Sequence, residues 1–208
     1  MQRRAFVLGL ATGLPLTLAG CGAVSVLAPD ADVARARYSD TELRALWLFT
    51  VRNNGTNAGA HTALLVNASQ RVIFDPAGSF GHPSLPERND VIFGITPQVE
   101  QFYTSYHARM SFHVIRQKIP VSPEVAEMAL TLCLGHGPVA KANCTRATSD
   151  ILRQLPGFES IRVVWFPERL MAQVQRLPGV VTDLIYEDDD DDKEIARAAY
   201  DALVGGTP

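Results

Sequence analysis

Short apolar runs separated by turn residues dominate the first half of the chain. The run from Leu46 to Val51 is typical of a β-strand, and it is followed by the turn signal Asn53-Asn54-Gly55. Two further runs flank the polar tetrad at 67–70, which favours a β-hairpin. The apolar pattern predicts strands over residues 46–51, 62–66, 71–75, 91–93, 111–119 and 161–166.

Helical spacing of apolar residues occurs between and after these strands. Ser39 and Glu42 have the Ser-x-x-Glu form of a capping box and indicate a short helix, and Ser122-Pro123 is a typical helix start. Longer helices are predicted over residues 99–106, 122–135, 143–155, 169–176 and 193–204. Because strands and helices do not alternate regularly, the predicted fold class is α+β, with a small antiparallel sheet packed with helices.

The N-terminus has the pattern of a secretory signal. Arg3 and Arg4 precede an apolar run that is too short for a transmembrane helix, and small residues follow it. Leu18-Ala19-Gly20-Cys21 resembles a bacterial lipobox, in which Cys21 is lipidated and becomes the first mature residue. We therefore expect a signal peptide at 1–20, and a protein anchored to the cell envelope through Cys21 and facing the periplasm.

The rest of the chain divides by composition. Residues 21–38 are small and mildly polar and are interpreted as a tether, and 39–182 form the predicted domain. Residues 183–208 hold an acidic run, Glu187 to Asp192, and the last predicted helix. A run of adjacent acids is usually solvated, and it lacks the alternate spacing of a calcium loop.

Overall composition narrows the functional classes. The chain has 208 residues, of which 47% are hydrophobic, so wholesale disorder is excluded. The formal net charge of −3 argues against a nucleic-acid partner, because phosphate binding needs a basic face. Three cysteines are too few for a disulfide scaffold.

Cys144 is the first candidate for chemistry. The pattern places it in the first turn of a predicted helix, where the positive end of the helix dipole favours a thiolate. The alternative is a buried helix cysteine. Cys133 lies on an apolar stripe and is interpreted as core, although an oxidising compartment also allows a Cys133–Cys144 disulfide.

His61 and Asp75 are the candidate partners of that thiol. His61 heads one strand of the predicted hairpin and Asp75 ends the other, so closing the hairpin brings these two ends together. The two side chains share a face only if the effective loop is odd. The alternatives are a solvated strand-end histidine and an ordinary turn aspartate.

These residues resemble a known family. Gly59-Ala60-His61-Thr62-Ala63-Leu64-Leu65-Val66, then Val72-Ile73-Phe74-Asp75, then Asn143-Cys144-Thr145 are similar to the circularly permuted form of the papain-like NlpC-type fold. The resemblance covers roughly residues 43–155. Thr145-Arg146 is less apolar than usual, and Asp75 stands where histidine is common.

The resemblance implies a thiol hydrolase without a cofactor, acting on an amide or an ester. Cys144 would be the nucleophile, His61 the general base and Asp75 its orienting residue. Cell-wall peptide is the leading substrate candidate, and acyl substrates remain open. Zinc is not expected, because no Cys-x-x-Cys or His-x-x-x-His spacing is present. The alternative is a non-enzymatic envelope lipoprotein that acts as a binding or assembly module.

Overall fold

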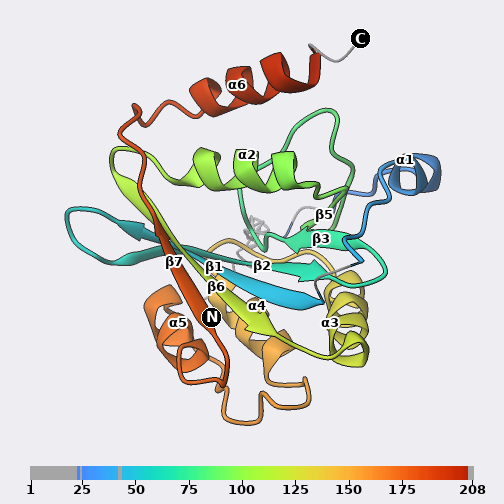
Figure 1. Cartoon of the computed structure of the whole chain (residues 1–208), viewed down its shortest axis with the longest axis vertical. Helices are drawn as coiled ribbons and strands as arrows, with labels where there is room; N and C mark the ends of the chain where they lie inside the picture. Colours follow the sequence, from blue (N-terminus) through green and yellow to red (C-terminus); the bar gives the residue numbers. More distant parts are fainter. Residues whose placement is uncertain (1–22, 24, 42–43, 206–208) are drawn as a thin grey trace, which may run out of the picture.

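The computed structural model describes residues 23, 25–41 and 44–205. This part of the chain forms a seven-stranded, fully antiparallel sheet with helices on both faces (Figure 1). The strands are β1 (Ala45–Asn53), β2 (Gly59–Asn67), β3 (Arg71–Phe74), β4 (Glu87–Arg88), β5 (Val91–Phe93), β6 (Phe112–Pro120) and β7 (Val181–Ile185), in the order β4-β5-β3-β2-β1-β6-β7. The helices are α1 (Asp30–Arg35), α2 (Pro97–His107), α3 (Pro123–Gly135), α4 (Cys144–Leu152), α5 (Pro167–Val174) and α6 (Glu194–Gly205). The predicted combination of helices with an antiparallel sheet is confirmed at this level.

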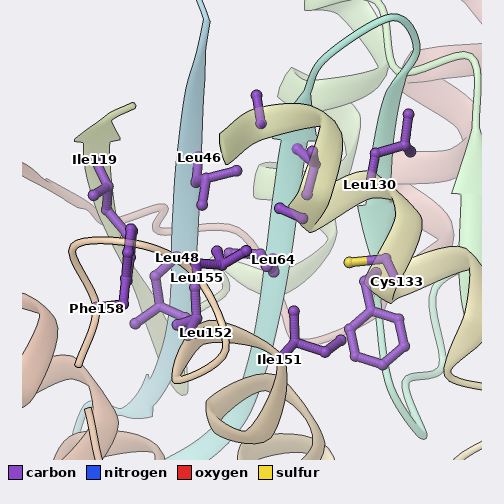
Figure 2. Packing of buried hydrophobic residues seen from close by; sticks show 14 of the residues in the cluster. Leu46, Leu48, Leu64, Ile119, Leu130, Cys133, Ile151, Leu152, Leu155 and Phe158 are labelled. Carbon is purple, nitrogen blue, oxygen red and sulfur yellow. The ribbon is translucent and has the colours of Figure 1, made fainter. Parts of the chain in front are cut away.

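Alternate residues of β1 face two separate apolar cores. Leu46 and Leu48 pack with residues of α3, α4 and α5, such as Ile151 (Figure 2). Trp47 and Phe49 face the opposite layer, formed by α2 and α6. A strand buried on both faces needs a continuous apolar run, and this explains the pattern in the sequence.

The predicted hairpin is formed by β2 and β3. Asn67 pairs with Arg71, so residues 68–70 form a three-residue loop. This odd loop places His61 and Asp75 on the same face, as the sequence argument required.

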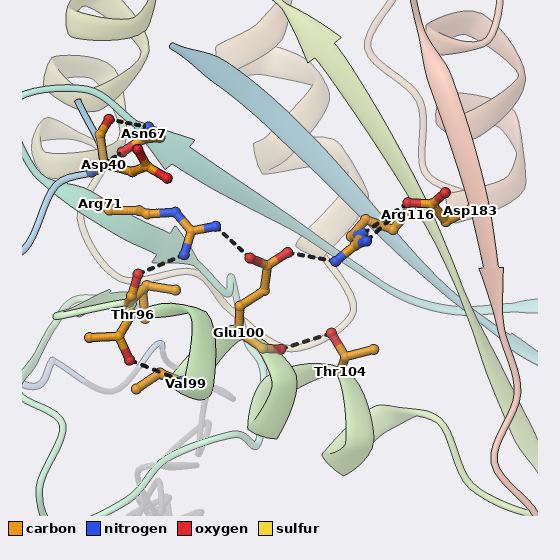
Figure 3. A network of polar contacts seen from close by, with 10 residues as sticks. Asp40, Asn67, Arg71, Thr96, Val99, Glu100, Thr104, Arg116 and Asp183 are labelled. Carbon is orange, nitrogen blue, oxygen red and sulfur yellow. Dashed lines mark hydrogen bonds and ion pairs between the residues drawn. The ribbon is translucent and has the colours of Figure 1, made fainter. Parts of the chain in front are cut away.

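A charged network fixes α2 against the sheet (Figure 3). Glu100 of α2, largely buried, pairs with Arg71 of β3 at 2.5 Å and with Arg116 of β6 at 2.7 Å. Arg116 also pairs with Asp183 of β7 at 3.0 Å. The network thus holds in place the helix that carries two residues of the candidate site described below.

Two predicted elements are absent from the described residues. The segment 161–166 is not a strand, because the available edge of β6 is occupied by β7 and side chains bind its backbone instead. Ser149 Oγ accepts from Val164 N at 3.2 Å, and Gln173 Oε1 accepts from Arg162 N at 2.6 Å. No helix begins at Ser39 in the described residues, since Asp40 is held by two bonds to the Asn67 side chain (Figure 3).

The predicted segment boundaries also need correction. Residues 27–35, interpreted as part of a tether, contain α1 and lie against β4, where Arg88 Nη2 donates to Asp30 Oδ1 at 2.5 Å. The boundary at 182 falls inside β7, because this strand pairs with β6 along its whole length.

The acidic run is exposed from Asp188 to Asp192, as expected for a solvated run, but some of its members bond to the rest of the protein. Ser105 Oγ donates to Glu187 at 2.7 Å, and Ser111 donates to Asp191 through its N–H and its hydroxyl. The signal at 1–20 and Cys21 lie outside the described residues. Within the described residues, no helix is both long and apolar enough to cross a bilayer.

Candidate active site

The candidate site lies at the end of the sheet where β2 begins. Alternation along β2 points His61 toward the α2 layer and Thr62 toward α4. The buried Thr62 hydroxyl lies 3.0 Å from the Thr145 hydroxyl in the first turn of α4. This contact holds the start of α4, and with it Cys144, beside His61.

His61 and Asp75 form a short hydrogen bond. His61 Nε2 lies 2.6 Å from Asp75 Oδ1, and the Asp75 side chain is only 3% exposed. Tyr103 Oη donates to the same carboxylate oxygen at 2.6 Å. Since Nε2 is bound to Asp75, Nδ1 is the ring nitrogen that remains for Cys144.

The electrostatics of the site favour a thiolate and an imidazolium. Burial alone lowers the pKa of His61, but the charges of Asp75 and Cys144 and the hydrogen bonds to them raise it to about 10. Burial alone raises the pKa of the Cys144 thiol. The hydrogen bond and charge of His61, with smaller effects of Thr145 and the Thr62 backbone, outweigh burial and lower the pKa of Cys144. Both shifts favour the state in which Cys144 carries a negative charge and His61 a positive one.

The second cysteine is chemically different. Cys133 is fully buried, and burial raises its pKa to about 12. It belongs to the core cluster around Leu130 and Ile151 (Figure 2), as its apolar stripe predicted. Both thiols are free, so the Cys133–Cys144 disulfide considered from the sequence is not formed in this structure.

Helix α2 supplies two residues that the sequence argument missed. Burial, together with the charge of Asp75, raises the pKa of Tyr103, so its hydroxyl remains a donor to Asp75. The His107 ring stacks on the His61 ring with centroids 5.7 Å apart, and its Nδ1 lies 2.9 Å from the Tyr103 carbonyl oxygen. Burial lowers the pKa of His107 to about 4, which keeps this ring neutral beside the charged one. Their spacing of four residues was the available signal, because it places both on one helix face, but the predicted helix at 99–106 ended one residue before His107.

The same residues resemble a metal donor set. One ligand atom from each of His61, Asp75 and His107 lies within 4.8 Å of the others. Two imidazoles and a carboxylate are suitable ligands for zinc. Zinc was not expected from the sequence because only short motifs such as Cys-x-x-Cys were searched for, and these three residues are far apart in the chain. However, bonds of about 2.0 Å to zinc place two tetrahedral ligands roughly 3.3 Å apart. The 2.6 Å contact between His61 and Asp75 is shorter, so metal binding would require this hydrogen bond to separate.

A cavity of about 280 Å³ opens beside His61 on the α2 side of the sheet. Gly78 belongs to its wall and lies against Asp75, so close that an added Cβ would fall 1.7 Å from Asp75 Oδ2. The absence of a side chain at position 78 therefore allows the loop to close over the carboxylate.

Together, the fold and the site define a mixed α/β protein with a cysteine, a histidine and an aspartate at the end of the sheet where β2 begins. Comparisons of the chain with protein-family models, with curated proteins and with solved structures find no match.

Proposed function

We propose that this protein is a thiol hydrolase with a permuted papain-like fold of the NlpC type. The observation that carries the proposal is the Cys144–His61–Asp75 constellation, in which the pKa of the thiol is lowered and that of the imidazole is raised. The order of the three residues along the chain is that of the permuted family. The proposal includes a lipid anchor at Cys21 and a periplasmic location, for which the sequence pattern is the support.

The proposed reaction begins with attack of the Cys144 thiolate on an amide or ester carbonyl. The Cys144 N–H lies in the first turn of α4, where N–H groups have no intrahelical partner, and it would donate to the developing oxyanion. His61 Nδ1–H then gives its proton to the leaving amine or alcohol as the carbon–heteroatom bond breaks, which leaves a thioester. Neutral His61 next takes a proton from water and the hydroxide attacks the thioester carbonyl. The carbon–sulfur bond then breaks, which releases the acid product and restores the Cys144 thiolate and the His61 imidazolium.

Asp75 and Tyr103 keep this imidazole oriented through both steps. Asp75 accepts from Nε2, so Nδ1 stays directed toward the sulfur, and the hydroxyl of Tyr103 fixes the carboxylate in turn. Cell-wall peptide is the leading substrate class for an envelope protein, and an acyl ester is the other.

The test is hydrolysis by the purified protein of two substrates, a muropeptide mixture analysed by mass spectrometry and p-nitrophenyl acetate. We expect Cys144→Ala and His61→Gln to remove nearly all hydrolysis. His82→Gln is the matched control, because His82 bonds to Asp201 away from Cys144 and this change should leave activity intact.

Reactivity of the thiols gives a second readout that needs no substrate. At pH 7, iodoacetamide should modify Cys144 well before Cys133, because only Cys144 has a lowered pKa. Equal alkylation rates, or hydrolysis that survives Cys144→Ala, would refute the hydrolase and leave a binding or assembly module.

A further inference from the structure

The cavity beside His61 contains an incompletely bonded buried cation. Arg109 follows the C-terminus of α2, lines this cavity and is only 2% exposed. Its Nη1 lies 3.4 Å from Asp189 Oδ2, and its Nη2 lies 3.4 Å from Ser105 Oγ. Both distances exceed the usual 2.7–3.2 Å of such hydrogen bonds. Its buried Nε has no hydrogen-bond partner in the described part of the chain.

A buried guanidinium normally has close anionic partners, because removing its charge from water is costly. Asp189, the residue paired with Arg109, is more than half exposed. Asp191 also lines the cavity, and its charge interacts with that of Arg109, but its carboxylate is hydrogen-bonded to Ser111. In the described part of the chain, Arg109 therefore has no close, buried anion as a direct partner.

A second cation lines the same cavity. Lys193 Nζ donates to Ser79 Oγ at 3.1 Å and lies 4.3 Å from the centre of the Tyr106 ring, and neither of these partners carries a charge. Among the described residues that line the cavity, Arg109 and Lys193 are the cations outside the catalytic pair, and Asp191 is the only anion there. The neighbouring His107 is neutral, and the charges of His61, Asp75 and Cys144 sum to one negative charge when all three groups are ionised.

We infer that this cavity binds a carboxylate group of the substrate, held by Arg109 and assisted by Lys193. The inference rests on the proposed function and names its substrate class: amides or esters that carry a carboxylate a few bonds from the carbonyl group that is attacked. Arg109 would bind the carboxylate through two parallel N–H groups, the geometry that suits a guanidinium. Because His61 lines the same cavity, the scissile carbonyl of a substrate bound in this way would lie near the catalytic pair.

The test measures charge selectivity at Cys144 without knowledge of the natural substrate. Iodoacetyl derivatives of glycine, β-alanine and 4-aminobutyrate carry a carboxylate at increasing distance from the reactive carbon. Each is compared with its carboxamide, and iodoacetate with iodoacetamide gives the baseline set by the imidazolium alone. We expect one length of linker to raise the acid-to-amide rate ratio about tenfold above this baseline, as a charged hydrogen bond would.

Substitutions of the two cations test whether the cavity causes this preference for a carboxylate. Arg109→Gln should return the ratio to the baseline, and Lys193→Gln should lower it severalfold. Arg197→Gln is the matched control, since Arg197 also lies over the Tyr106 ring but does not line the cavity, and it should leave the ratio unchanged. If Arg109→Gln fails to fold, as shown by its circular dichroism, Lys193→Gln against Arg197→Gln decides the question.

The alkylation rates distinguish a failure of carboxylate binding from a failure of the proposed hydrolase. If Cys144 reacts rapidly with iodoacetamide but no linker gives a raised ratio, carboxylate binding is refuted and the hydrolase proposal stands. A raised ratio that survives both Arg109→Gln and Lys193→Gln also refutes the inference. If Cys144 reacts no faster than Cys133 with any probe, the proposed function fails, and carboxylate recognition for catalysis fails with it.

Discussion

Gly78 offers the sharpest test of the constellation, because its substitution affects Asp75 without altering any of the three reactive side chains. An ideal Cβ at position 78 would lie 1.7 Å from Asp75 Oδ2 and 2.3 Å from Asp75 Cγ, whereas real Cβ contacts are not shorter than 3.0 Å. The carboxylate would have to move by about 1.3 Å in Gly78→Ala. A movement of this size breaks its 2.6 Å hydrogen bonds to His61 and Tyr103.

The expected effect follows from the loss of the bond to His61. A charge-assisted hydrogen bond contributes about 1.5–3 kcal/mol. Each pKa unit corresponds to about 1.4 kcal/mol, so the pKa of His61 should fall by roughly one to two units. The equilibrium constant between the thiolate–imidazolium pair and the neutral thiol–imidazole pair should then fall about ten- to a hundredfold. The assay is the rate of Cys144 alkylation by iodoacetamide from pH 4 to pH 10, followed by mass spectrometry.

Gly81→Ala is the matched control in the same loop, since a Cβ there meets nothing within 4 Å. It should alkylate like the wild type, whereas Gly78→Ala should react more slowly at pH 7 and should show a shifted pH profile. A folded Gly78→Ala protein with the wild-type alkylation profile would show that the Asp75 contact does not set the state of the pair.

Three further outcomes are expected. Burial lowers the pKa of His107 to about 4 from 6.5, so the unfolded state takes up a proton at a higher pH than the folded state. The free energy of unfolding should therefore fall as the pH drops from 6.5 to 4. Chemical denaturation should show a smaller fall in His107→Phe, and an equal fall in the two proteins would contradict the burial argument. Glu100→Gln should lower the free energy of unfolding by about 2–4 kcal/mol, because it leaves the buried Arg71 without its carboxylate partner. Asp150→Asn, which breaks the exposed ion pair with Arg153, should lower it by less than about 1 kcal/mol. Cys21→Ser should abolish partitioning of the expressed protein into a detergent phase, and unchanged partitioning would exclude the lipid anchor.

Local patterns were sufficient to predict most of the fold. The runs at 46–51, 62–66 and 71–75 became β1, β2 and β3, because each combines apolar side chains with turn residues at its ends. Ser122 became the N-cap of α3, where its hydroxyl accepts from Val125 N, as the Ser-Pro start indicated. The meeting of His61 with Asp75 was predictable for the same reason, since one hairpin brings their strand ends together.

Features that depend on competition between distant segments were not predictable. Residues 161–166 have strand-like composition, but only the folded sheet decides that β7 pairs with β6 in their place. The same holds for Tyr103 and His107, which reach the site because Glu100 ties α2 to two strands. A lone arginine after a helix, such as Arg109, shows its incomplete bonding only when the cavity around it is known.

The burial of Asp75 couples the site to the stability of the fold. The Asp75 side chain is 3% exposed, and burial alone would raise its pKa. The positive charge of His61 and the hydrogen bond that His61 donates outweigh the effect of burial and lower the pKa of Asp75. Asp75→Ala would leave a buried imidazolium without its carboxylate and should cost about 3–5 kcal/mol of stability, whereas Cys144→Ala leaves the His61–Asp75 pair intact and should cost much less. Because the folded pKa of His61 is raised to about 10 from 6.5, the stabilisation is complete below pH 6.5 and is lost as the pH rises through 10. The difference in unfolding free energy between wild type and Asp75→Ala should therefore shrink between pH 6.5 and pH 10. A difference that stays constant over this range would mean that Asp75 contributes by packing alone, and that His61 is not held charged in the folded protein.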